Sequence, residues 1–167
     1  DLAATLTEDI SSGLSRFSYL LVSAPGSQPA DVSTGYVLNS TLQKAGATLR
    51  LSTQLIDRAN GQQVWGNSFE HTWDETDLLS IQDDLTDRVV ASVADPYGAL
   101  MRDLSQGVEL KAIEEMSPYD VVLRYFIFRQ RVSEQDHLET RKALEHGVKI
   151  DPGNAHLWAA LAAVYTE

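Results

Sequence analysis

The stretch Tyr36–Thr72, YVLNSTLQKAGATLRLSTQLIDRANGQQVWGNSFEHT, decides the fold. Its apolar residues recur at every second position, which is the period of a β-strand with one buried face. The alternation is cleanest over 48–57, where one face carries Leu49, Leu51, Thr53 and Leu55 and the other carries Arg50, Ser52 and Gln54. Asn60-Gly61 is a strong hairpin signal, and residues 44–47 predict the other turn. The stretch therefore predicts a three-stranded antiparallel meander, with strands at 36–42, 48–57 and 63–72.

Upstream of the meander, residues 7–17 predict a short helix with Thr7 as its N-cap. Its apolar stripe consists of Ile10, Leu14 and Phe17. Gly13 is expected to weaken this helix by about 1 kcal/mol relative to alanine. The apolar run Tyr19–Val22 predicts a buried strand, and the breaker-rich stretch Pro25–Gly35 predicts a loop.

Downstream of the meander, a long helix is predicted from Asp74 to about Asp95 and ends at Pro96. Its apolar stripe consists of Leu78, Ile81, Leu85, Val89 and Val93. The later residues carry no strand signals. They predict a weak linker helix at 99–115, interrupted by Gly107, and further helices at 119–131, 133–149 and 155–167. We therefore expect an α+β fold, a small mixed sheet with flanking helices, over residues 1–96, a linker helix at 97–117, and helical hairpins over 118–167.

The composition excludes several classes of function. The 167 residues carry 24 acidic and 13 basic side chains, a net charge of −11. This balance disfavours nucleic-acid partners and anionic membrane surfaces, both of which attract basic proteins. The absence of cysteine removes disulfides, thiolate metal sites and cysteine nucleophiles. No apolar run reaches about 18 residues, so no membrane span is expected, and the start at Asp1 suggests a piece of a longer protein.

No constellation of residues predicts catalysis, a cofactor or a metal. Gly46 and Gly61 do not form a phosphate loop, and no nucleophile elbow is present. The four histidines lack metal spacing and are expected at the surface: His71, His137, His146 and His156. The carboxylates are expected at a helix start or on a solvated helix face: Asp74, Glu75, Asp77, Asp83 and Asp84. The aromatic residues are expected in cores or at a helix junction: Trp65, Phe69, Trp73, Tyr119, Tyr125, Phe126 and Phe128.

The end of the chain resembles a tetratricopeptide repeat junction. Pro152 stands where that family closes a repeat, and the next repeat is matched by Trp158, Leu161, Ala162 and Tyr165. In the preceding hairpin, Leu144 and Gly147 suit the large and small positions, whereas Thr140 does not. The resemblance implies stacked helical hairpins with a surface for protein partners. It also implies that Leu157, Trp158, Leu161 and Val164 await a further helix or a second copy.

Residues 5–95 resemble the TolB-like amino-terminal domain found in bacterial class III adenylate or guanylate cyclases. The segments that carry the likeness are 6–10 with 14–17, 36–40, 49–57, Gly61 with 64–65, and 81–86. That family has a strand before its first helix and a second helix before the segment matched by 36–40. This sequence has neither, so we expect residues to be missing before Asp1 and between Ser23 and Gly35.

Together the resemblances imply a non-catalytic regulatory or sensory module of a bacterial signalling protein, most of all a class III adenylate cyclase. Its partner would be a protein bound by the helical repeats. Copies of the chain could also form a homo-oligomer. A periplasmic location is favoured over a cytoplasmic one. No residue of a ligand or partner site is assigned. The alternative is a cell-envelope assembly adaptor or scaffold with no cyclase attached.

Overall fold

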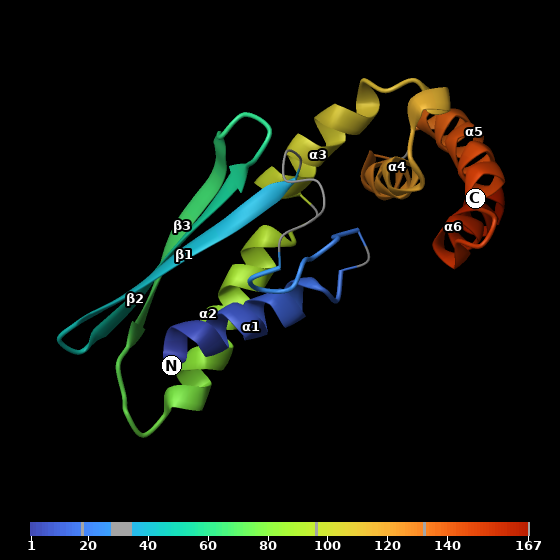
Figure 1. Cartoon of the computed structure of the whole chain (residues 1–167). Coiled ribbons are helices and arrows are strands. Elements are labelled where there is room, and N and C mark those ends of the chain that lie inside the picture. Colours follow the sequence, from blue (N-terminus) through green and yellow to red (C-terminus); the bar gives the residue numbers. More distant parts are fainter. Residues whose placement is uncertain (18, 28–34, 96, 132, 167) are drawn as a thin grey trace. The chain divides into compact units, whose positions relative to one another are not determined.

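The computed structural model describes residues 1–17, 19–27, 35–95, 97–131 and 133–166. The chain divides into two compact units, Asp1–Met101 and Arg102–Glu167. We call them the sheet unit and the helical unit and describe each by itself. The α+β class expected from the sequence is confirmed (Figure 1).

The sheet unit contains the predicted meander. Its strands are β1 (Tyr36–Ala45), β2 (Thr48–Asp57) and β3 (Gln63–Thr72), all antiparallel in the order β1-β2-β3. Gly46 (φ 60°) and Gly61 (φ 73°) occupy the two turns, where the left-handed backbone favours glycine. The period-two pattern therefore predicted the three strands, except that β1 continues to Ala45 and leaves a shorter turn than the predicted 44–47.

The two faces of the sheet differ as the alternation predicts. The inner face buries residues of β2 and β3, namely Leu49, Leu51, Thr53, Leu55 and Phe69. The outer face is polar: the Arg50 guanidinium donates to Oε1 of Glu70, and the hydroxyls of Ser52 and Ser68 lie 3.0 Å apart. One face therefore forms the core of the unit, and the other meets solvent.

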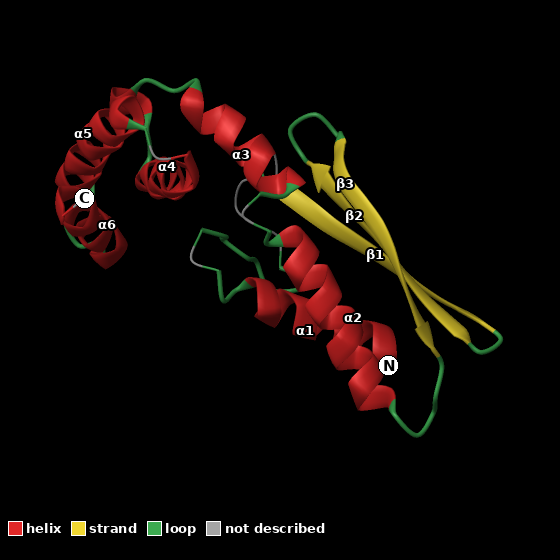
Figure 2. Cartoon of the chain, turned by 180° about the vertical axis from the view of Figure 1, so that it is seen from behind, coloured by secondary structure: helices red, strands yellow, loops and turns green. Residues whose placement is uncertain are grey.

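Two helices lie on the inner side of the sheet, α1 (Leu2–Leu14) and α2 (Leu78–Val93) (Figures 1 and 2). The α1 helix begins earlier than predicted, because Asp1 and not Thr7 is its N-cap. The Asp1 side chain accepts from the Ala3 amide, while the Thr7 hydroxyl donates to the Ala3 carbonyl from inside the helix. The earlier start buries Leu6 together with the predicted Ile10 and Leu14.

The α2 helix begins later than predicted, at Leu78. Asp74 instead closes a turn, in which its Oδ1 accepts from the Thr76 amide at 2.9 Å. The predicted stripe is otherwise confirmed, with Ile81, Leu85, Val89 and Val93 buried and Leu78 38% exposed. Pro96, the predicted end of the helix, lies outside the described residues.

Gly13 lies where α1 crosses α2. A Cβ atom added there would be 2.7 Å from Cγ2 of Val90. The glycine that the sequence marks as a weak point of α1 is therefore what allows the two helices to approach closely.

The strand predicted at Tyr19–Val22 is wrong. These residues form a turn and irregular chain, and Leu21 is 78% exposed. Tyr19 is buried, and its hydroxyl donates to the Ala94 carbonyl at the end of α2. A strand needs a pairing partner, and no described strand pairs with this segment. Of the predicted loop at 25–35, residues 28–34 lie outside the described residues.

The helical unit follows the predicted order of helices. The α3 helix (Ala99–Glu109) runs from one unit into the next and includes Gly107, which does not interrupt it. A short 3-10 turn (Ile113–Glu115) leads to α4 (Pro118–Arg131), α5 (Glu134–Ile150) and α6 (Ala155–Thr166). Pro118 opens α4, and the Ser133 hydroxyl caps α5 by accepting from the Asp136 amide.

The core of the helical unit forms where α4, α5 and α6 meet. Its fully buried side chains include Val121, Leu144, Leu157 and Val164. Gly147 faces this junction, and a Cβ added there would lie 3.1 Å from Cγ1 of Val121. The three-helix packing is compatible with the helical hairpins that the sequence suggests. No helix in the described part of the chain is both long and apolar enough to cross a membrane.

Candidate interaction surface

The α6 helix is apolar on both sides, which is unusual for a helix at a surface. Its inner side packs on α4 and α5 and buries Leu157, Ala160, Leu161 and Val164. Its outer side exposes Trp158, Ala159, Ala162 and Tyr165. Positions 158, 162 and 165 follow the i, i+4, i+7 spacing of one stripe. We call Trp158, Ala162 and Tyr165 the outer stripe.

The structure corrects the expectation that the whole apolar set of α6 awaits a partner. Leu157, Leu161 and Val164 are already covered within the unit, because α4 and α5 suffice to bury them. Trp158 is 50% exposed and Tyr165 is 60% exposed. Of the four residues predicted to await a partner, only Trp158 remains exposed, and Ala162 and Tyr165 lie beside it on the outer stripe.

Both aromatic side chains of the outer stripe are held in place by hydrogen bonds. The indole N–H of Trp158 donates to the Pro152 carbonyl at 2.9 Å. The Tyr165 hydroxyl donates to Oε1 of Glu145 at 2.7 Å, and this bond raises the pKa of the tyrosine. An aromatic group that is fixed before binding loses less conformational entropy when a partner covers it. Exposed Trp and Tyr are also the residues that most often anchor protein interfaces.

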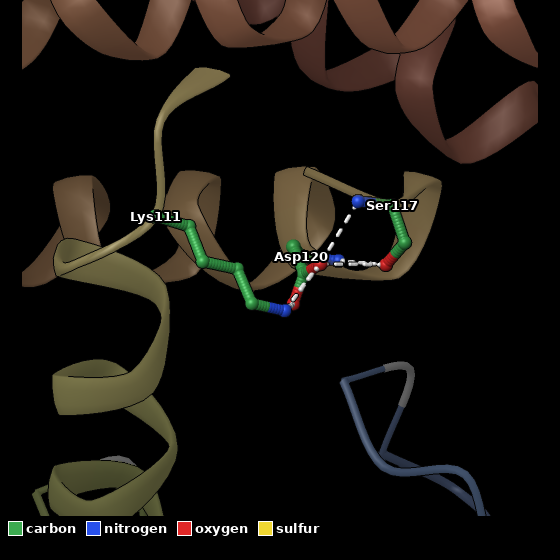
Figure 3. Close-up of polar contacts among 3 residues, drawn as sticks. All are labelled: Lys111, Ser117 and Asp120. Atoms are coloured by element: carbon green, nitrogen blue, oxygen red, sulfur yellow. Dashed lines mark hydrogen bonds and ion pairs between the residues drawn. The ribbon is translucent and has the colours of Figure 1, made fainter. Parts of the chain in front are cut away.

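A polar brace centred on the buried Asp120 lies at the start of α4 (Figure 3). Oδ2 of Asp120 accepts from the amide and the hydroxyl of Ser117, each at 2.8 Å, and the Asp120 amide donates back to that hydroxyl. Lys111 Nζ lies 2.9 Å from both carboxylate oxygens. Burial raises the pKa of Asp120, but the bonds from Lys111 and Ser117 outweigh it and hold the pKa below its ordinary value.

The brace is a helix cap with an added cation. Ser117 and Asp120 are three residues apart and satisfy each other's amides, which is the reciprocal capping arrangement. The sequence predicts a helix at 119–131, and the Ser-x-x-Asp spacing of residues 117–120 is the signal that could have shown this cap. Lys111 fixes the segment after α3 to this cap. The brace therefore positions α4.

A small hollow lies beside α4 and α5. It is lined by Glu109, Arg124, Ile127, Phe128, Asp136 and Thr140, and it encloses about 20 Å³. That volume holds about one water molecule, whereas small-molecule sites measure about 300–1,000 Å³. This hollow is too small to be a substrate site.

The acidic residues singled out in the sequence do not converge on one point. Asp74 closes its turn, and a carboxylate oxygen of Glu75 lies 3.9 Å from Lys44 Nζ. Asp77 is the N-cap residue of α2 but makes no capping bond with its side chain. Asp83 is exposed, as predicted. Asp84 is half-buried and accepts from Arg88 one helical turn later.

The histidines are less exposed than expected. Nε2 of His71 lies 3.8 Å from Oδ2 of Asp84, and Nε2 of His137 lies 2.9 Å from the Val164 carbonyl. His146 is half-buried, and His156 alone of the four is fully exposed. Within the described ranges, no three His, Asp or Glu side chains are placed to hold a metal ion together.

The aromatic residues singled out in the sequence belong mainly to the packed parts of each unit. Phe128 and Phe69 are buried, whereas Trp65, Trp73, Tyr119, Tyr125 and Phe126 are half-buried. The register places Trp65 opposite Leu55 on the inner face of the sheet, as predicted. Lys44 Nζ lies 4.0 Å from the centre of the Trp73 ring, a cation–π contact between the first hairpin and the end of β3.

Comparison with known proteins gives a relative that matches most of the chain. No family model matches the chain. The chain is similar to a protein of Rhizobium meliloti (strain 1021) named "Putative adenylate cyclase 3", with 26% identity over 176 residues. The match covers 95% of this chain and 28% of that protein, so it includes both units but little more than a quarter of the relative's length. Because the match is longer than the 167 residues here, the relative has residues that this chain lacks.

Proposed function

We propose that this chain is a non-catalytic regulatory module of a signalling protein related to adenylate cyclases. The observation that carries the proposal is the similarity over 95% of the chain to part of a protein whose printed name is that of an adenylate cyclase. The module acts by binding a protein partner through the outer stripe of α6. The polar brace at Asp120 and the Gly147 junction keep the helices that support this stripe in place.

The partner that fits the outer stripe is an apolar helix. Two fixed aromatic side chains stand at the ends of the stripe, the exposed Ala162 lies between them, and the exposed Ala159 is next to Trp158. Small residues allow a second helix to approach closely, while the aromatic rings supply contact area. The sequence resemblance to tetratricopeptide repeats supports the same kind of partner.

The enzymatic part of the proposal is tested with the purified chain. Incubated with ATP and either Mg²⁺ or Mn²⁺, the chain should yield no cyclic AMP above a blank without protein. Turnover that rises in proportion to the protein concentration would contradict the non-catalytic assignment.

The regulatory part is tested in the full-length protein that contains this chain. Ala162→Glu places a charge in the middle of the outer stripe, whereas Ala91→Glu is a matched control at another exposed helical alanine, on α2. Ala162→Glu should change the rate of cyclic AMP formation in the full-length protein, and Ala91→Glu should not. Equal rates for both variants and the unchanged protein would refute regulation through α6. A full-length protein without cyclase activity would favour the adaptor role.

A further inference from the structure

The β1 strand forms an edge of the sheet among the described residues. The Arg58 amide donates to the Gly35 carbonyl, and this pair continues the β1–β2 register. Hydrogen-bonded pairs alternate along an antiparallel ladder, so the odd-numbered residues of β1 bond to β2. The backbone groups of Leu38, Ser40 and Leu42 therefore point away from β2 and meet no described strand.

The two edges of the sheet are protected very differently. The β3 edge carries Glu70, Gly66 and a bulge opposite Leu55 and Ile56, features that discourage another strand from pairing. The β1 edge is ten residues long and pairs with β2 without a bulge. It contains no proline and no acidic residue, and its single charge is Lys44 near the end. Natural proteins rarely leave such an edge open.

The sequence of β1 is complementary to itself. When a second β1 runs antiparallel with Ser40 opposite Ser40, the outward backbone groups of both strands meet in register. Leu38 then faces Leu42 of the second copy, and Tyr36 faces Lys44. Cross-strand leucine pairs are favourable. Lys44 already contacts the Trp73 ring of its own chain, so the two leucine pairs carry the complementarity. The chain has a net charge of −11, but no acidic residue lies on this seam.

We propose that two copies of this chain pair through β1, antiparallel about Ser40, to form a continuous six-stranded sheet. Leu38 and Leu42, which are half-buried in one copy, become covered by the same residues of the other. This pairing uses backbone hydrogen bonds of the sheet unit and is independent of the regulatory role proposed for α6.

The absence of cysteine allows a direct test of the register. Ser40→Cys introduces one thiol per chain, and a hydrogen-bonded antiparallel pair places the Cα atoms about 5.5 Å apart, within disulfide reach. Ser68→Cys is the matched control: Ser68 is also exposed, lies in the middle of the other edge strand and makes one side-chain contact to β2. Under mild oxidation, Ser40→Cys should form covalent dimers and Ser68→Cys should remain monomeric.

Sedimentation measures the pairing without cross-linking. The unchanged chain should sediment at twice its mass of 18.4 kDa. Ser40→Lys and Ser40→Asp should each weaken self-association about fivefold, since like charges then face each other, and an equimolar mixture of the two should restore it. Ser68→Lys should leave the mass unchanged.

Three results would overturn the proposal. One is a mass of 18.4 kDa at all concentrations up to the solubility limit. Another is a dimer in which Ser40→Cys does not cross-link, which would place the contact elsewhere, on the outer stripe or on another face. The third is equal cross-linking of Ser40→Cys and Ser68→Cys, which would indicate random collision.

Discussion

Replacing Gly147 by alanine tests whether close packing or helix propensity dominates in the helical unit. The new Cβ would lie 3.1 Å from Cγ1 of Val121 and 3.3 Å from both Cδ atoms of Leu157. All three contacts are tighter than ordinary van der Waals distances. Val121 and Leu157 are fully buried, so neither side chain has free space into which to move.

The expected magnitude follows from two opposing contributions. Alanine in place of a helical glycine stabilises by about 1 kcal/mol, whereas overpacking a filled core costs about 1–3 kcal/mol. Gly107→Ala is a matched control: Gly107 lies near the end of another helix of the same unit, and a Cβ there meets nothing within 4 Å. Gly107→Ala should therefore stabilise the protein by about 1 kcal/mol, and Gly147→Ala should be less stable than this control by about 1–3 kcal/mol.

Urea unfolding followed by circular dichroism measures both variants, and hydrogen exchange of the amides of α4 to α6 assigns the change to the helical unit. Removing the obstructing methyl groups in Val121→Ala should abolish or reverse the penalty of Gly147→Ala, since the added Cβ then fills space. If Gly147→Ala stabilises as much as Gly107→Ala, the close contact at this junction is not a packing constraint and the reasoning fails.

The remaining predictions concern single side chains. Asp120→Asn should lower the free energy of unfolding at pH 7 by about 1–2 kcal/mol. Burial raises the pKa of Asp120, but bonds from Lys111 and the start of α4 lower it more, so the pKa in the folded protein lies below the unfolded value of 3.8. The stability that the Asp120 carboxylate contributes is therefore complete above pH 3.8 and is lost as the pH falls through the lower pKa of the folded protein. The urea midpoint of Asp120→Asn should consequently change less over this acidic range than that of the unchanged protein. Trp65→Ala should cost about 2 kcal/mol in thermal unfolding, because this side chain is half-buried on the inner face opposite Leu55. Val64→Ala, which removes a smaller half-buried side chain at the bulge, should cost less than about 1 kcal/mol. The reverse order would contradict the assignment of Trp65 to the core. Tyr19→Phe should cost about 1 kcal/mol by leaving a helix-end carbonyl without its donor, and an unchanged melting temperature would show that this bond is dispensable.

The meander could be predicted because its signals are local. The alternation over Thr48–Asp57 and the turn at Asn60-Gly61 specify both the strands and their connections within a few residues. The apolar run Tyr19–Val22 lacks such a signal. A strand also needs a partner, and a short apolar run does not show whether one exists.

The helix starts were wrong where the sequence offers two caps. Asp1 and Thr7 are both good N-cap residues, and the burial of Leu6 favours the earlier one. Asp74 and Asp77 compete in the same way, and the hydrogen bonds of Asp74 to Thr76 make a turn there, so the helix starts after Asp77. Tertiary contacts decide between such alternatives, and a single sequence does not contain them.

The candidate surface could be predicted only in part. The apolar composition of α6 shows that it has too many apolar residues for one buried face, but not which of them α4 and α5 cover. The β1 edge, which pairs with no other strand in the described part of the chain, has no sequence signal of its own, because its residues form an ordinary strand. An edge is defined by what does not pair with it, and this becomes visible when the sheet is built.

Different interactions stabilise binding at the β1 edge and at the outer stripe, so variants can test the two surfaces separately. Pairing at β1 depends on backbone groups and on a register fixed by Ser40, whereas binding at the outer stripe depends on the area of two aromatic side chains. Ala162→Glu should therefore leave the dimer mass unchanged while it alters cyclic AMP formation in the full-length protein. Ser40→Lys should dissociate the dimer without touching the outer stripe. If each variant instead changed both properties, self-pairing and regulation would be coupled, and the dimer itself would be the regulated state.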